Sequence, residues 1–104
     1  MNRDKNLPVT ETTYYILLAL LEPAHGYLIM QKVEELSIQQ VKIAAGTLYG
    51  AIENLLKQKL IQSVISEDSR RKVYLITESG KEVLMLDLER MRHMIKITES
   101  KLKL

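Results

Sequence analysis

Apolar residues recur at three- and four-residue spacings along most of this chain, and a two-residue alternation replaces that spacing in three short stretches. The helical spacing predicts helices over residues 10–21, from 27 to about 36, from about 47 to about 59, and from 78 toward the end of the chain. The alternation predicts strands at 41–43, 61–65 and 73–76. The sequence therefore predicts a mainly α fold with a small β-hairpin.

Residues at the predicted helix ends agree with these boundaries. Thr10 and Thr77 stand where an N-cap is expected, because a threonine hydroxyl can accept a hydrogen bond from the first turn. His25 precedes the second helix, where we expect it to pack or to cap. The apolar spacing places Leu21 and Leu36 on the core side of the first two helices.

Length and composition narrow the class of protein. A chain of 104 residues with 46% hydrophobic residues is expected to form one domain with a modest core. The longest apolar run, Ile16–Leu21, is too short to span a membrane, and the first residues do not have the pattern of a signal peptide. The sequence contains no cysteine, which excludes disulfides and thiolate metal sites. We expect a cytoplasmic protein that is not bound to a membrane.

Positive charge is concentrated in the middle of the chain. The net charge is only +2, but residues 37–81 carry seven Lys/Arg against four Asp/Glu, whereas residues 1–36 carry three against five. Such a local excess indicates that the middle segment meets a polyanion.

The third predicted helix has the properties of a helix that reads DNA. On a helical wheel its apolar residues fall on one side, and the other side carries Thr47, Gly50, Glu53, Asn54 and Lys57. Gly50 would allow close approach of the backbone to the bases. Asn54 could bond an adenine edge, Glu53 a cytosine amine and Lys57 a phosphate, and the Tyr49 hydroxyl could donate to a phosphate. The alternative is an ordinary amphipathic helix with a solvated polar face.

A basic segment follows this helix at the end of the hairpin loop. Arg70, Arg71 and Lys72 are adjacent, and cations at this place would neutralise phosphates and release counterions. The alternative is that the charges keep an edge strand from pairing with other chains. Helix and hairpin in this order favour the first interpretation: residues 47–58 enter the major groove and residues 66–72 touch the adjacent backbone.

These segments resemble the PadR-like family of winged-helix transcriptional regulators. The matching pieces run in family order and are Tyr15–Leu21, His25–Tyr27, Gly46–Tyr49, Asn54–Leu55, Leu60–Ile61 and Arg70–Gly80. The resemblance implies a winged helix-turn-helix domain (residues 1–80), followed by a long C-terminal dimerisation helix (residues 81–104). It also implies a homodimeric repressor that binds an inverted repeat in double-stranded DNA, with Lys42, Thr47, Tyr49, Arg70, Arg71 and Lys72 at or near the DNA.

The chain also departs from the family pattern in three places, one of which is Ser69 in the hairpin loop, where glycine is common. Asn54-Leu55-Leu56 stands where members tend to have Arg-Leu-Glu, so the preferred base sequence is expected to differ. Lys59 stands where members tend to have glycine, and a non-glycine residue in a left-handed helix cap costs about 1 kcal/mol. This turn is therefore a second place where the chain can differ from the family.

The last helix carries an apolar seam. Its residues are spaced by four and three positions in turn, as in a coiled coil, and are Leu84, Leu88, Met91, Ile95, Thr98 and Leu102. The seam can pack on its own domain or on a second copy. We expect a homodimer, because few residues follow Gly80 and a single helix cannot bury such a stripe alone.

Other chemistry is sparse in this sequence. There is no glycine-rich phosphate loop, nucleophile elbow or paired-histidine motif, so we expect no enzyme activity, no cofactor and no metal site. Apolar residues around the seam fit a dimer core, or a pocket for a small apolar effector lined in part by Tyr14 and Tyr15. The resemblance to the PadR-like family implies that such an effector can be phenolic. The main rival is a winged-helix module that binds a protein and not DNA.

Overall fold

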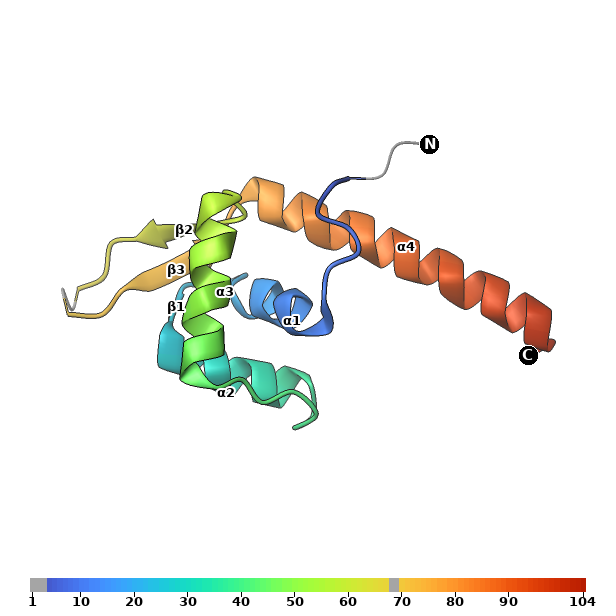
Figure 1. The fold of residues 1–104 in the computed structure, drawn as a ribbon, viewed down its shortest axis with the longest axis horizontal. Helices are drawn as coiled ribbons and strands as arrows, with labels where there is room; N and C mark the ends of the chain where they lie inside the picture. The colour runs from blue at the N-terminus through green and yellow to red at the C-terminus, as the bar shows by residue number, and fades with distance from the viewer. Residues whose placement is uncertain (1–3, 68–69) are drawn as a thin grey trace.

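The computed structural model describes residues 4–67 and 70–104 and contains four helices and three strands (Figure 1). In chain order the elements are α1 (Glu11–Ala19), β1 (Ala24–His25), α2 (Gly26–Leu36), α3 (Ala45–Lys57), β2 (Ile61–Val64), β3 (Val73–Ile76) and α4 (Glu78–Leu102). The predicted fold class is confirmed: the molecule is a winged helix with a long C-terminal helix.

Helices α1, α2 and α4 each begin at a residue whose side chain caps them. The Thr10 hydroxyl accepts a hydrogen bond from the Thr13 amide (3.1 Å), and the Thr77 hydroxyl accepts one from the Gly80 amide (3.1 Å). His25 caps α2 through Nδ1, which accepts from the Leu28 amide at 3.3 Å. All three caps agree with the sequence-based expectation.

The small sheet is antiparallel and has the order β1-β3-β2. The hairpin β2–β3 pairs Ile61 with Ile76 and Val64 with Val73. We refer to this hairpin and the residues between its strands as the wing. Strand β1, which the sequence did not predict, pairs with the other edge of β3. Two residues are too few to show an alternating pattern.

The prediction of a strand at residues 41–43 is wrong. Val41 is buried, and its backbone groups bond to one side chain: its amide donates to Ser37 Oγ (2.9 Å), and Ser37 Oγ donates back to its carbonyl (3.4 Å). The segment therefore packs on the end of α2 and has no strand neighbour. Leu21 and Leu36 are also more exposed than expected, at 49% and 48%, because α1 ends at Ala19 and α2 ends at Leu36 itself.

One core joins the helices to the sheet. Its fully buried side chains include Leu17, Leu20, Ile29 and Leu48, contributed by α1, α2, α3 and the turn after α1. The first turns of α4 also belong to this core, because Val83 and Leu84 are buried in it. The rest of α4 projects away from the other elements and gives the molecule a longest dimension of 54 Å (Figure 1).

Lysine takes the left-handed cap after α3. Lys59 has φ of 60°, a conformation that usually favours glycine. The amide of Leu60 donates to the Leu55 carbonyl at 3.0 Å across this turn. Although lysine and not glycine stands at position 59, the turn after α3 still contains a left-handed residue there.

Candidate nucleic-acid interface

The outer face of α3, which we define as Gly46, Thr47, Gly50, Glu53, Asn54 and Lys57, is exposed along its whole length. Its opposite side holds α3 to the core through Leu48, Ile52 and Leu55. A Cβ atom added at Gly46 or Gly50 would meet nothing within 4 Å. The helix therefore presents polar side chains around two gaps in which its backbone is open to another molecule.

The N-terminus of α3 is also open. Its N-cap, Ala44, has no side-chain acceptor, and the first turn contains no acidic residue. The first amides of a helix have no partner within the helix and favour an anion. Lys42 is exposed in the segment that leads to this end, but it does not line the hollow beside the wing.

Tyr49 joins α3 to the start of α2. Its hydroxyl would lie 2.7 Å from a Cβ at Gly26, so the missing side chain of Gly26 makes room for the tyrosine ring. The ring is still 53% exposed. Tyr49 thus flanks the outer face of α3 on the side that faces the wing.

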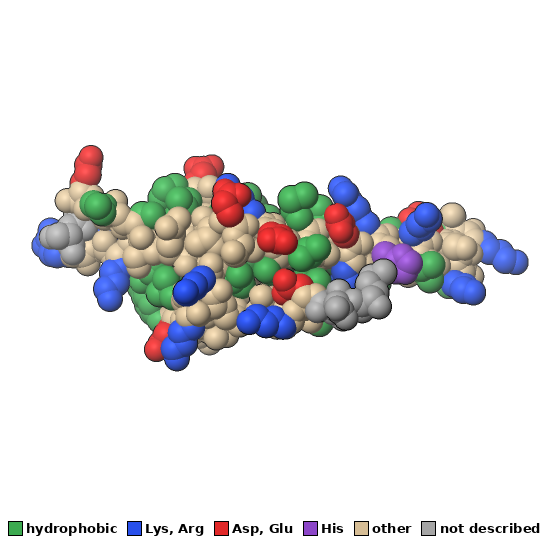
Figure 2. Space-filling model, turned by 90° about the horizontal axis from the view of Figure 1, so that it is seen from above, with side chains coloured by type: hydrophobic (Ala, Val, Ile, Leu, Met, Phe, Trp, Pro, Cys, Tyr) green, Lys and Arg blue, Asp and Glu red, His purple; other side chains and the backbone are tan. Residues whose placement is uncertain are grey.

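A hollow of ≈ 680 Å³ lies between the wing and the start of α2. We call it the basic groove, and its polar lining residues are His25, Gln31, Tyr49, Arg70, Arg71, Lys72 and Tyr74. Burial raises the pKa of the Tyr74 hydroxyl, and the nearby Tyr49 raises it further, so the Tyr74 hydroxyl can donate a hydrogen bond at neutral pH. In Figure 2 Lys and Arg side chains lie at the wing end and along the edge that faces the viewer in Figure 1.

His25 links α2 to the wing across 46 positions of sequence. Its Nε2 lies 3.0 Å from Nη1 of Arg71, while its Nδ1 faces the Leu28 amide. A neutral imidazole has one acceptor nitrogen, so it can accept from one of these two donors at a time. The side chains of His25 and Arg71 therefore lie together at the edge of the basic groove.

The structure brings some predicted DNA-binding residues together and separates others. Tyr49, Arg70, Arg71 and Lys72 line the basic groove, whereas Asn54 lines a different hollow on the other flank of α3. Asp68 and Ser69, at the loop tip expected to touch the backbone, lie outside the described residues. Gln31 and Tyr27 also line the groove, and no pattern in the sequence pointed to them beyond the start of a helix.

The seam of α4 divides into two parts. Leu84 is 7% exposed and packs in the core of its own chain, and Leu88 and Met91 are half-buried. Ile95 (56% exposed) and Leu102 (64%) lie in open solvent, as does Thr98. The seam is partly open to another molecule at Leu88 and exposed beyond Met91, in the far half of α4 (residues 91–102).

Comparison with known proteins identifies the family. Residues 16–86 match the transcriptional regulator PadR-like family. This chain belongs to that family. The match covers the winged helix and the start of α4, and members of the family are DNA-binding transcription regulators. The comparison with curated proteins gave no match.

Solved structures agree with this assignment. A PadR family transcription regulator from Clostridium difficile is similar over 89% of this chain and 99% of its own, with 26% identity and a TM-score of 0.74. One from Eggerthella lenta is 30% identical over 86% of this chain and 79% of its own, with a TM-score of 0.66. RosR from H. salinarum shares the fold over 96% of this chain and all of its own, with 22% identity and a TM-score of 0.68.

A cluster of metal-binding side chains and a membrane-spanning helix are both absent from the part of the chain that the structure describes. No group of three or more His, Cys, Asp or Glu side chains there could hold a metal ion. None of the helices searched in the same residues is both long and apolar enough to cross a membrane.

Proposed function

We propose that this PadR-family regulator is a repressor that binds an inverted-repeat operator as a homodimer. In each copy α3 enters the major groove, and the wing contacts the neighbouring phosphates. The observation that carries the proposal is the outer face of α3, with its open glycines, beside a groove lined by three adjacent cations.

The outer face of α3 suits base edges in both size and chemistry. A helix with side chains is about 10–12 Å across, and the major groove of B-DNA is about 12 Å wide. The gaps at Gly46 and Gly50 let the backbone approach the bases, while Glu53 and Asn54 supply an acceptor and an amide. These four positions would determine which sequence is bound.

The basic groove suits the phosphate backbone. Arg70, Arg71 and Lys72 would each neutralise a phosphate and release counterions, which gives affinity that is independent of base sequence. The Tyr49 hydroxyl and the open N-terminus of α3 add donors near Thr47, and Lys57 adds a cation near its C-terminus. Lys42 would contribute from the segment before α3.

The far half of α4 supports pairing of two copies. Ile95 and Leu102 are more than half exposed on a helix whose last turns contact no other described element. Apolar residues at heptad spacing are stable when a partner helix covers them. A second copy is the partner we propose, through Leu88, Met91, Ile95, Thr98 and Leu102, with Leu84 at the buried end of the seam.

Two-fold pairing determines the form of the operator. A symmetric dimer presents its two α3 helices to half-sites that are related by the same symmetry, roughly 34 Å apart on one face of DNA. An inverted repeat near a promoter is the sequence that fits. Occupation of such a site would block transcription.

A small effector has a place to bind between α1 and α4. A hollow of ≈ 420 Å³ there is lined mainly by apolar surface from Val9, Tyr14, Tyr15, Leu18 and Met91. Burial, and then the charge of Asp87, raises the pKa of Tyr14, so its hydroxyl is neutral and can bond a phenolic ligand. We propose that an apolar or phenolic effector enters here, changes the angle between the α4 helices and releases the DNA.

A gel-shift titration against the DNA upstream of the chain's own coding region, at several salt concentrations, tests the proposal. We expect preference for one inverted repeat and a steep loss of affinity with salt. Arg70→Ala plus Arg71→Ala should reduce the slope of log K against log salt by about 0.9 for each phosphate that is no longer neutralised. Salt-independent binding, or a double variant that binds DNA as the wild type does, would leave a protein-binding module as the better description.

A further inference from the structure

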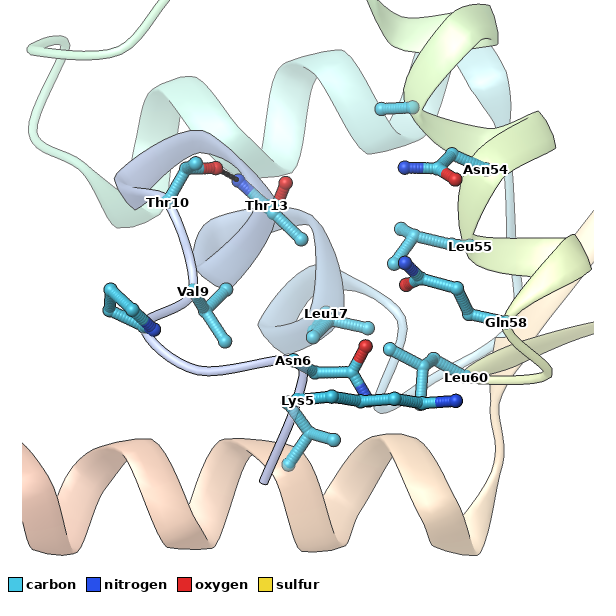
Figure 3. Close-up of a pocket in the computed structure, with 13 residues that line it drawn as sticks. Lys5, Asn6, Val9, Thr10, Thr13, Leu17, Asn54, Leu55, Gln58 and Leu60 are labelled. Atoms are coloured by element: carbon cyan, nitrogen blue, oxygen red, sulfur yellow. Dashed lines mark hydrogen bonds between the residues drawn. The ribbon is translucent and has the colours of Figure 1, made fainter. Parts of the chain in front are cut away.

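The molecule has a second polar hollow, on the flank of α3 away from the wing, and of the polar residues that line it the proposed function uses Asn54 alone. It lies between α3, the start of α1 and residues 4–10, which we call the N-terminal arm (Figure 3). Its volume is ≈ 220 Å³, and its polar lining comes from Lys5, Asn6, Thr13, Asn54 and Gln58. Of the described residues that line it, Lys5 is a cation and none is a carboxylate. This lining is suited to an anion.

The arm packs on the rest of the domain after Lys5 and forms a turn of its own around Lys5. Leu7 and Val9 pack against the core. Before them, the Asn6 amide donates to Asp4 Oδ1 (2.8 Å) and the Leu7 amide donates to the Asp4 carbonyl (3.0 Å). The Asp4 carboxylate is thus engaged within the arm, while Lys5 stays exposed. Because the backbone is already ordered, binding through Lys5 loses little conformational entropy.

The arm and the wing lie on opposite sides of α3 (Figure 1). A helix that fills the major groove has a phosphate backbone running along each of its flanks. The basic groove faces one of these backbones. The other backbone would pass the flank of α3 that carries Asn54 and Gln58, next to the arm.

We infer that the N-terminal arm is a second backbone-contact surface, in which Lys5 binds a phosphate of the strand that the wing does not reach. The side chains of Thr13 and Gln58 donate hydrogen bonds to the same stretch of backbone. This inference rests on the proposed docking of α3 in the major groove. Since α4 leaves the domain on the arm side (Figure 1), the arm faces the centre of a dimer paired through α4, and the wing faces its outer ends.

A charge-matched pair of variants tests the contact. Lys5→Ala removes the cation of the arm, and Lys32→Ala removes one that lies beside Glu22 and Glu35 in another hollow. On a mixed-sequence duplex of about 30 base pairs, long enough for two half-sites, Lys5→Ala should lower the salt slope by about 0.9 for each phosphate that Lys5 neutralises in the wild type. Lys32→Ala should leave the slope unchanged. Equal slopes for Lys5→Ala and the wild type would overturn the inference.

Replacing single phosphates of the DNA by uncharged groups locates the contact made by Lys5. Methylphosphonates placed singly along the selected operator should weaken wild-type binding at positions toward the centre and at positions toward the outer ends. Lys5→Ala should lose sensitivity at a central position and keep it at the outer ones, whereas Arg71→Ala should show the reverse. If Lys5→Ala keeps the wild-type profile at every position, the arm does not touch the backbone. Wild-type protein that prefers no inverted repeat would instead contradict the proposed function.

Discussion

Two exposed surfaces of this molecule, the outer face of α3 and the far half of α4, have opposite chemistry. The first is polar, contains two glycines that leave the helix backbone open, and lies beside the cations of the wing. The second carries Met94, Ile95, Ile97 and Leu102, each 45% exposed or more. A surface of the first kind is ready for a charged, hydrated partner, and one of the second kind is stable only when a partner removes it from water. This difference fits the two partners of the proposed function, DNA and a second copy.

The largest expected effect comes from placing a charge on the α4 surface. Ile95→Asp should leave the protein monomeric and weaken operator binding by about 10²- to 10⁴-fold. The two winged-helix domains would then bind their half-sites as separate molecules. Sedimentation equilibrium and a gel shift measure the two effects. Ile95→Leu, which keeps the apolar area, is the control and should remain dimeric. A stable dimer of Ile95→Asp would place the interface elsewhere.

Filling a gap on the α3 surface should separate stability from function. Gly50→Leu puts a side chain into open space, so the free energy of unfolding should rise by about 1 kcal/mol from helix propensity. The same side chain would keep the backbone from the bases, and we expect operator affinity to fall at least about tenfold, or about 1.4 kcal/mol. Denaturant unfolding and a gel shift check the two directions, and Gly50→Ala should show the stability gain with a smaller loss of binding. Unchanged operator affinity for Gly50→Leu would show that α3 does not lie in the major groove.

The cap of α2 supports the DNA surface and not the dimer surface. His25→Ala removes the acceptor for the Leu28 amide and the contact with Arg71, so we expect the free energy of unfolding to fall by about 1 kcal/mol. DNA affinity should fall with it, while the dimer dissociation constant stays the same. His25→Asn restores a capping side chain without reaching Arg71. It should recover stability but not affinity, and recovery of both would show that the Arg71 contact is unimportant for binding.

The smallest effect is expected at the turn after α3. Lys59→Gly relieves the left-handed strain but also increases the freedom of the unfolded chain, and these two effects partly cancel. We expect a rise of about 0.5 kcal/mol in the free energy of unfolding, measured by urea titration, with unchanged dimerisation. A loss of stability would mean that the Lys59 side chain makes a favourable contact that outweighs the strain.

The local elements were predictable, and the contacts between distant segments were not. The β3 strand and the Thr10 and Thr77 caps follow from spacing and side-chain chemistry within a few residues. The false strand at 41–43 arose because the Ser37 side chain bonds the backbone of Val41, which no alternating pattern can show.

In the candidate site, too, the features local in sequence were predictable and the contacts between distant segments were not. The adjacent cations of the wing were visible in the sequence, since neighbours in sequence stay neighbours in space. The approach of His25 to Arg71, and that of Lys5 to the flank of α3, depend on how the whole domain folds. For this reason the sequence placed the wing flank of the interface and missed the arm.

The joint between α3 and α4 has a mechanical consequence. Thr77 donates through its hydroxyl to the Lys59 carbonyl (2.8 Å) and through its amide to the Leu60 carbonyl (3.0 Å), and a Cβ at Gly80 would overlap that same Leu60 oxygen. These contacts hold the turn after α3 against the start of α4, so we expect α3 and α4 to move together. The 25 residues of α4 span about 37 Å, so a rotation of about 5° displaces one end by roughly 3 Å. That displacement is close to the rise of one base pair, about 3.4 Å. In the proposed dimer it would put the two α3 helices out of phase with their half-sites.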